Sequence, residues 1–233
     1  MKTKKETVIM KNALARAQHD LNLGEKRIIS IAISKINPKT NKINYNTTKA
    51  RTITIETSDY QKTAKLSNEK NAYPEMKRSA KELINKKLKI KTRTMTGHQT
   101  EIINWISTLK YETGQGYLKI SFTPEIMPYL VAIKDRFTRY ELKKTEGIRS
   151  IYSWRMLEFL TSWSKDKNGK REISITEFGE MIGQPENYKT GDTIARIIKP
   201  AIKELEKKGW RITHERRKTN GIFTHITFTW YEP

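Results

Sequence analysis

Residues 191–230 read GDTIARIIKPAIKELEKKGWRITHERRKTNGIFTHITFTW, and they join a basic helix to a β-hairpin. Apolar residues recur at helical spacing from Gly191 to Lys208, which predicts one helix face packed against a core. Trp210–Glu215 and Ile222–Trp230 read as strands, and the Asn-Gly pair between them is a strong signal for a hairpin turn. The stretch therefore predicts a helix followed at once by a hairpin.

The residues before this stretch complete a known arrangement. Ser150–Ser164 (SIYSWRMLEFLTSWS) is an aromatic-rich helix, Glu172–Ile175 a short strand and Thr176–Ile182 a short helix. Helix, strand, short helix, basic helix and hairpin, in that order, form a winged helix-turn-helix. This fold presents one helix and one hairpin to DNA.

The same order of elements recurs in the first half of the chain. Ala13–Ile36 has helical periodicity with a break near Gly24, and three strands follow the last helix as a wing would. The expected elements after the first helix are Arg51–Glu56, Tyr60–Leu66, Asn71–Lys87, Leu88–Thr94, Glu101–Thr108 and Tyr117–Ser121. The fold class predicted is α+β, with two tandem winged-helix domains.

The junction between the two halves is predicted from its composition. Phe122–Arg136 reads as a helix leading into a connector at Asp135–Gly147, and the charged residues 1–11 are expected to be loose. We therefore expect an N-terminal domain over residues 12–134 and a C-terminal domain over residues 135–233.

The chain carries 46 Lys and Arg residues against 25 Asp and Glu residues, a formal net charge of +21. Such an excess predicts a polyanionic partner, either nucleic acid or an acidic membrane surface. The absence of cysteine excludes disulfides, Cys-based zinc sites and thiol nucleophiles. No apolar run approaches the ~20 residues needed to cross a bilayer, and the start of the chain lacks a signal peptide's apolar stretch, so we expect a cytoplasmic protein.

Two features of the second half are suited to contact DNA. The arc opposite the apolar face of the basic helix carries cations for phosphate contact, and Arg196 could reach guanine O6 and N7. Pro200 is expected to kink the helix, and the hairpin tip adds a cationic wing. The candidate residues are Thr193, Arg196, Lys199, Lys203, Arg216, Arg217 and Lys218. The competing interpretation is a merely solvated basic arc.

Residue patterns typical of enzymes are missing from the sequence. The histidines, His19, His98, His214 and His225, are scattered, and no His-x-His pair or P-loop motif occurs. His214 and His225 are expected to oppose each other across the last hairpin as a structural pair. We predict a protein that is not an enzyme and that uses no cofactor and no metal.

Several segments together resemble the initiator replication proteins of iteron-controlled, theta-replicating plasmids. They are FTRY at 137–140, SIYSWRMLEFL at 150–160, RIIKPAIKEL at 196–205, NAL at 12–14, GEKRIISIA at 24–32, ISF at 120–122 and MPYL at 127–130. The resemblance covers about residues 12–230.

This resemblance implies two winged-helix domains with a pseudo-two-fold relation, and it implies double-stranded origin DNA as the partner. Monomers would bind tandem repeats (iterons), help open an A·T-rich segment and recruit the host initiator and replicative helicase, whereas dimers would repress their own gene. The second domain would be the principal DNA reader, through Lys189–Lys203. The first would supply the dimer contact and further DNA contacts, through Asn71–Lys87. The resemblance thus adds Lys189, Tyr73, Lys77, Arg78 and Lys81 to the candidate DNA-binding residues.

Three alternatives remain at this point. A winged-helix transcriptional regulator without a replication role needs the same binding surface. A relaxase or nuclease lacks support, because the His pair and an acidic metal cluster are missing. An acidic-lipid binder is disfavoured, because no long amphipathic segment joins a cationic face to a bulky membrane-inserting one.

Overall fold

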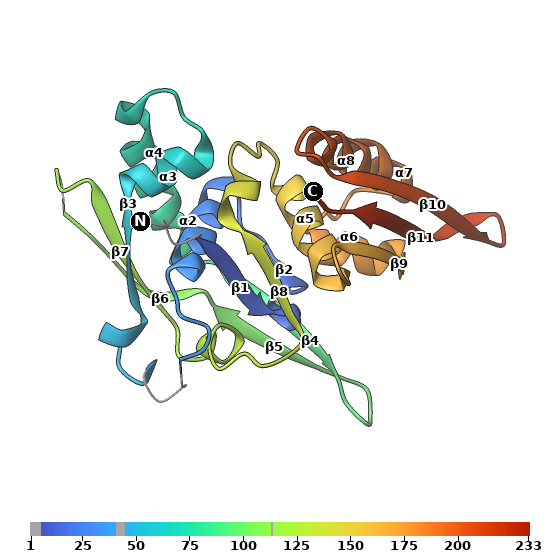
Figure 1. Cartoon of the computed structure of the whole chain (residues 1–233). Helices are drawn as coiled ribbons and strands as arrows, with labels where there is room; N and C mark the ends of the chain where they lie inside the picture. The colour runs from blue at the N-terminus through green and yellow to red at the C-terminus, as the bar shows by residue number, and fades with distance from the viewer. Residues whose placement is uncertain (1–5, 41–44, 113) are drawn as a thin grey trace. The chain divides into compact units, whose positions relative to one another are not determined.

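The computed structural model describes residues 6–40, 45–112 and 114–233. The chain divides into two compact units, Met1–Arg149 and Ser150–Pro233, whose elements Figure 1 shows in chain order. Each unit is described by itself. None of the helices in the described ranges combines the length and apolar content needed to cross a membrane.

The first unit contains the predicted order of helix, strand, two helices and hairpin (Figure 1). These elements are α2 (Leu23–Ser34), β3 (Thr52–Glu56), α3 (Thr57–Ala64), α4 (Glu69–Leu83), β6 (Ile106–Tyr111) and β7 (Tyr117–Phe122). Their sheet has the order β3-β7-β6. A short helix, α1 (Asn12–Ala15), precedes α2.

The second unit repeats this order. It consists of α5 (Ile151–Trp163), β9 (Asn168–Ser174), α6 (Ile175–Ile182), a helical segment from residue 190 to residue 206, β10 (Arg211–Thr219) and β11 (Ile222–Tyr231). Its sheet has the order β10-β11-β9, so the last strand lies between the other two, as β7 does in the first unit. The prediction of two winged-helix domains is confirmed.

The first unit also contains a hairpin that the second lacks. The strands β4 (Lys87–Arg93) and β5 (His98–Asn104) pair with each other, and β4 also pairs with the short β2 (Gln18–His19). The strand predicted over 101–108 is interrupted at Trp105, whose side chain is buried. The β4–β5 hairpin is therefore inserted between α4 and the wing, which is β6–β7.

The helix predicted over Phe122–Arg136 is wrong. Apart from a 3-10 turn at Met127–Tyr129 the segment is irregular. Pro124 and Pro128 explain this, because proline has no N–H to donate and disfavours helical backbone in the residue before it.

The connector predicted over 135–147 is also wrong. It contains β8 (Phe137–Glu141), which pairs antiparallel with β1 (Thr7–Lys11). Residues 7–11 are therefore an ordered strand rather than loose chain, and residues 1–5 lie outside the described residues. Because this pairing keeps residues 135–149 in the first unit, the division falls after Arg149 and not after Lys134.

Helix starts are set by side-chain caps. Asn22 Oδ1 accepts from Glu25 N–H at 3.0 Å, and Glu25 Oε2 accepts from Asn22 N–H at 2.8 Å, which forms a capping box at α2. The Ser150 and Ser174 hydroxyls cap α5 and α6. The helices α2, α5 and α6 therefore begin at defined residues.

The core of the second unit is aromatic. Phe159, Phe178 and Phe228 lie with ring centroids 5.2–5.8 Å apart, and Trp154 and Trp230 are fully buried. Such rings supply large apolar area to a small domain. The aromatic residues Trp154 and Phe159 of α5 therefore pack in this core.

Candidate nucleic-acid interface

The basic helix of the second unit changes its hydrogen-bonding pattern along its length. It consists of α7 (Thr190–Asp192), a π-helical stretch over Thr193–Ile198 and α8 (Lys199–Glu206). The wider π turns lie directly before Pro200, which stands in the first turn of α8. Because Pro200 lies within a continuous helical segment, it removes one backbone hydrogen bond and crowds the preceding turn, and the wider turns before it accommodate this.

This helix has the two faces that the sequence predicts. The apolar residues Ile194, Ile197, Ile198, Ala201, Ile202 and Leu205 are buried. Arg196, Lys199 and Lys203 are exposed, as is Lys189 just before the helix. The helix therefore presents cations to solvent along most of its length.

Thr193 does not belong to this exposed set. Its side chain is fully buried, and its hydroxyl donates to Gln184 Oε1 at 2.6 Å. The Gln184 side chain packs on Gly179 of α6, where a Cβ would lie only 2.4 Å from Gln184 Cδ. Thr193 therefore joins the basic helix to the turn after α6, and the expectation of a DNA-facing Thr193 is wrong.

Arg196 is held by two neighbours one to two turns back. Its Nε lies 3.4 Å from Asp192 Oδ1, and its guanidinium lies 5.5 Å from the ring centre of Tyr188. Hydrogen bonding to Tyr188 and the charge of Asp192 raise the Arg196 pKa further, so the side chain stays cationic. With 64% of the side chain exposed, Arg196 is held in place and still accessible.

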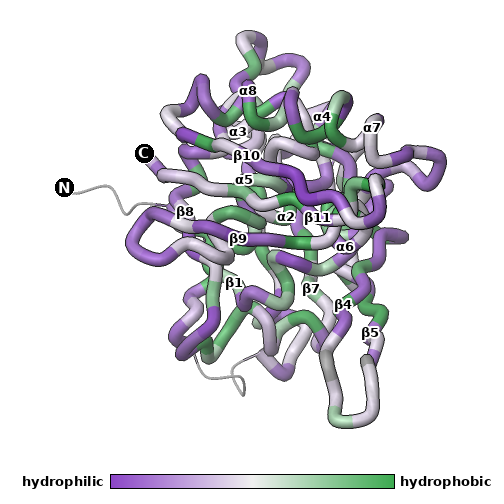
Figure 2. The backbone as a smooth tube through the Cα atoms, turned by 90° about the vertical axis from the view of Figure 1, so that its right-hand side faces the viewer, coloured by the Kyte–Doolittle hydropathy of each residue, from purple (hydrophilic) through white to green (hydrophobic). Residues whose placement is uncertain are grey.

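The hairpin β10–β11 has a tight tip. Asn220 and Gly221 both have positive φ, 51° and 79°, as a type I′ turn requires. Figure 2 marks β10 as a largely hydrophilic strand, because Arg216, Arg217 and Lys218 all lie on it. The predicted cationic wing is present.

The three wing cations have different partners. The Arg216 guanidinium and the Lys218 ammonium lie 4.5 Å and 4.7 Å from the Phe223 ring centre. Arg217 Nε instead donates to Glu172 Oε1 at 2.8 Å, and this hydrogen bond lowers the pKa of Glu172. Part of the Arg217 charge is therefore compensated within the protein.

In the first unit, α4 carries the corresponding cations. Lys77 is partly exposed, and Arg78 and Lys81 are exposed. The Lys77 and Lys81 ammonium groups lie 4.3 Å and 5.8 Å from the ring centre of Tyr111, the last residue of β6. Tyr73 donates its hydroxyl to the carbonyl of Glu112 at 3.1 Å.

Sequence reasoning missed the residues that hold these cations. Tyr111, Tyr188 and Phe223 each lie under a cation, and Gln184 fixes the turn before the basic helix. An aromatic residue beside a cationic hairpin tip was the available signal for Phe223. Tyr111 gave no local signal, because its partners Lys77 and Lys81 lie far earlier in the sequence.

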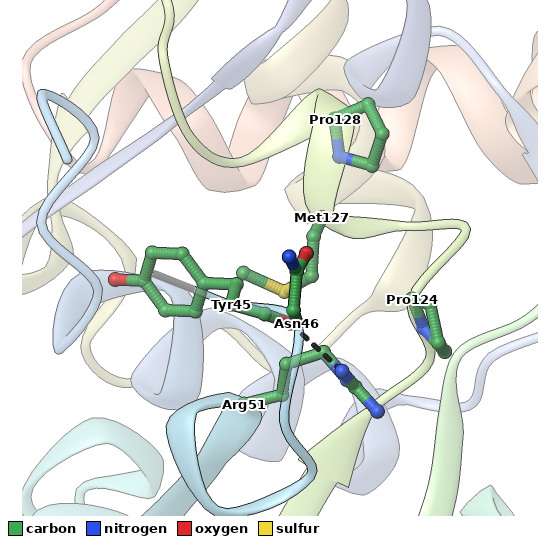
Figure 3. Close-up of a pocket in the computed structure, with 6 residues that line it drawn as sticks. All are labelled: Tyr45, Asn46, Arg51, Pro124, Met127 and Pro128. Atoms are coloured by element: carbon green, nitrogen blue, oxygen red, sulfur yellow. Dashed lines mark hydrogen bonds between the residues drawn. The ribbon is translucent and has the colours of Figure 1, made fainter. Parts of the chain in front are cut away.

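A small pocket in the first unit carries no chemistry of its own (Figure 3). It is lined by Tyr45, Asn46, Arg51, Pro124, Met127 and Pro128. Arg51 is buried and donates to the carbonyls of Tyr45 and Phe122 at 2.7 Å and 3.1 Å. Its guanidinium therefore joins the segment at Tyr45 to the end of β7.

The predicted opposition of His214 and His225 is wrong. The register pairs His214 with Phe228 and His225 with Arg217. Burial lowers the pKa of His214, which favours the neutral form of its imidazole. Across the ranges that the structure describes, no group of three His, Asp or Glu side chains is arranged to hold a metal ion.

The two units define the class as a tandem winged-helix protein in which each unit has a cationic helix followed by a hairpin. Residues 7–161 match the family model described as "Initiator Replication protein, WH1", and residues 174–230 match "Initiator Rep protein, WH2". The chain belongs to this family of plasmid replication initiators, as its segments predicted.

The fold also has a counterpart among solved structures. A crystal structure of the Pi initiator protein in complex with iteron DNA matches 99% of this chain and 99% of its own, with 20% identity and a TM-score of 0.78. The WH1 domain of MSBI1.176, a replication protein isolated from a multiple sclerosis patient, matches 47% of this chain and 79% of its own, with 22% identity and a TM-score of 0.36.

Proposed function

We propose that this protein starts plasmid replication by binding tandem repeats in double-stranded origin DNA. The observation that carries the proposal is the match of both halves, in tandem, to the two initiator family models. The Pi initiator, which shares the fold, was crystallised with iteron DNA. A DNA-binding role also accounts for the net charge of +21.

Each winged-helix unit would contact the duplex with its basic helix, and the second unit would also use its wing. In the second unit the contacts are Lys189, Arg196, Lys199, Lys203, Arg216, Arg217 and Lys218, and in the first they are Tyr73, Lys77, Arg78 and Lys81. Most of these are exposed cations suited to phosphates, and Arg196 is the candidate for base recognition. The second unit would be the principal reader.

The partners beyond DNA belong to the same proposal. Bound copies would help open an adjacent A·T-rich segment and recruit the host initiator and replicative helicase. A dimer formed through the first unit would repress the protein's own gene. The protein acts in the cytoplasm and by binding alone, without catalysis.

The test uses the DNA that flanks the gene. Tandem direct repeats about two helical turns long would place one copy of the protein on each repeat. A plasmid carrying only the gene and this DNA should replicate, and deletion of the repeats should abolish replication. Repeat binding without replication would support the transcriptional regulator instead.

Arg196 gives the sharper measurement on the isolated protein. If it binds guanine in bidentate fashion, Arg196→Ala should weaken binding to the repeat by about 1–3 kcal/mol and relax one base position. Arg139→Ala is the matched control, because Arg139 is exposed on β8, outside both proposed surfaces. Equal losses on repeat and random duplexes would mean that Arg196 contacts only phosphate.

A further inference from the structure

In the first unit, one aromatic ring lies where the basic helix meets the wing. Tyr73, Lys77 and Lys81 stand at four-residue steps and therefore form one stripe along α4. All three contact the end of β6: the two lysines approach the Tyr111 ring, and Tyr73 donates to the next carbonyl, that of Glu112. The stripe thus lies beside the wing, with Lys81 exposed and Tyr73 and Lys77 partly exposed.

The second unit has a similar arrangement of two cations around one aromatic ring, here within its wing. Arg216 and Lys218 of β10 both approach the ring of Phe223, the second residue of β11. All three side chains lie within a few residues of the Asn220–Gly221 turn. In both units, then, two cations share one ring.

Two like charges on one ring repel each other, so packing of these side chains alone does not explain the arrangement. A ring offers its negative face to a cation and thereby restricts long, flexible side chains. Fixing a side chain in advance reduces the entropy that binding would otherwise cost. A phosphate approaching the pair would also remove the repulsion.

Resting on the proposed function, we infer that Tyr111 and Phe223 are positioning residues for phosphate contact. Each ring holds its two cations in place before DNA arrives, at the helix–wing junction in the first unit and along the wing in the second. The rings act through the cations and not by contacting DNA themselves. In the first unit the same ring also joins the basic helix to the wing.

Conservative and disruptive substitutions distinguish the effect of the aromatic ring on DNA binding from other effects of the same side chain. Tyr111→Phe and Phe223→Tyr keep the aromatic face, whereas Tyr111→Leu and Phe223→Leu remove it with similar apolar bulk. Affinity is measured by fluorescence anisotropy across a salt series, on a random duplex of about 30 base pairs, three helical turns. Circular dichroism checks that each variant is folded.

Each leucine variant should bind about three- to tenfold more weakly, and each aromatic variant should bind like the parent protein. The slope of log affinity against log salt should not change, because the cations still reach the phosphates. Lys77→Gln with Lys81→Gln should instead reduce the slope by about 2, close to 0.9 per lost phosphate contact. Adding Tyr111→Leu to that double variant should not weaken DNA binding any further.

Unchanged affinity in both leucine variants would overturn the inference. A loss from Tyr111→Leu that persists in the Lys77→Gln/Lys81→Gln background would also overturn it, because the tyrosine would then act independently of the lysines. If one leucine variant fails to fold, the other ring provides the same test in the other unit. A random duplex keeps this test separate from the proposed function, which depends on preference for the repeats.

Discussion

Glu25 is a buried carboxyl whose replacement should stabilise the first unit at neutral pH. Its side chain has no solvent exposure, and it lies at the start of α2 with one oxygen accepting from Asn22 N–H. Burial is the main cause that raises its pKa from 4.5 to about 7, and the nearby Glu82 adds to the rise. The Asn22 hydrogen bond and the charge of Lys86, 3.8 Å away, act in the opposite direction.

The magnitude follows from proton linkage. Raising the pKa from 4.5 to about 7 corresponds to about 3 kcal/mol, at 1.36 kcal/mol for each pH unit. Between these two values the folded state keeps the proton that the unfolded state has lost. The contribution of Glu25 to stability therefore falls as pH rises from about 4.5 to about 7, and the full penalty is present above that range.

Glu25→Gln removes the titrating group and keeps an acceptor for Asn22 N–H. We expect the variant to be about 2–3 kcal/mol more stable than the parent protein at pH 8, and close to it at pH 4.5. Urea unfolding at several pH values, followed by circular dichroism, measures the difference. Glu206→Gln, an exposed carboxylate on α8, controls for the loss of one negative charge.

A difference between Glu25→Gln and the parent protein that is the same at pH 4.5 and pH 8 would refute this reasoning. So would a variant that is less stable at pH 8, because the attraction between Glu25 and Lys86 would then outweigh the cost of burying the charge.

Three further substitutions test a close packing contact, a turn conformation and a partly buried ion pair. Gly169→Ala should destabilise the second unit by about 3 kcal/mol, because the new Cβ would lie 2.1 Å from the Trp230 ring; an unchanged melting temperature would contradict this. Gly221→Ala should cost about 1 kcal/mol in urea unfolding, since φ is +79° there, and a neutral result would argue against the type I′ turn. Arg27→Met should cost about 2 kcal/mol, because it leaves Glu75 without its 3.0 Å ion pair; stabilisation would show that burying Arg27 costs more than the pair returns.

The order of the elements could be predicted from the sequence because it depends on local signals. Helical periodicity, the Asn-Gly turn and the alternation of β11 all act within a few residues. The two sheets β3-β7-β6 and β10-β11-β9 are those of the winged-helix pattern. The cationic helix and wing of the second unit were predicted for the same reason.

The junction could not be predicted, because it depends on distant pairing. β8 belongs to the first unit because it pairs with β1, which lies some 130 residues earlier in the chain. The apolar residues of 122–136 have a helical pattern, and the two prolines outweigh it.

For Thr193, the assumption of a regular α-helix predicts the wrong side-chain orientation. An arc drawn at 3.6 residues per turn puts Thr193 with Arg196, but residues 193–198 are π-helical and take more residues per turn. Thr193 therefore turns inward to Gln184. Tyr111 was missed for a different reason, since contacts between α4 and β6 are set only by the tertiary fold.

The pairing of β1 with β8 brings the beginning and the end of the first unit together. A module whose two ends are neighbours can be excised, inserted into a host loop or rejoined in a new order with little distortion of its interior. Exchange of this unit between related genes would give a protein new binding preferences while its fold stays the same.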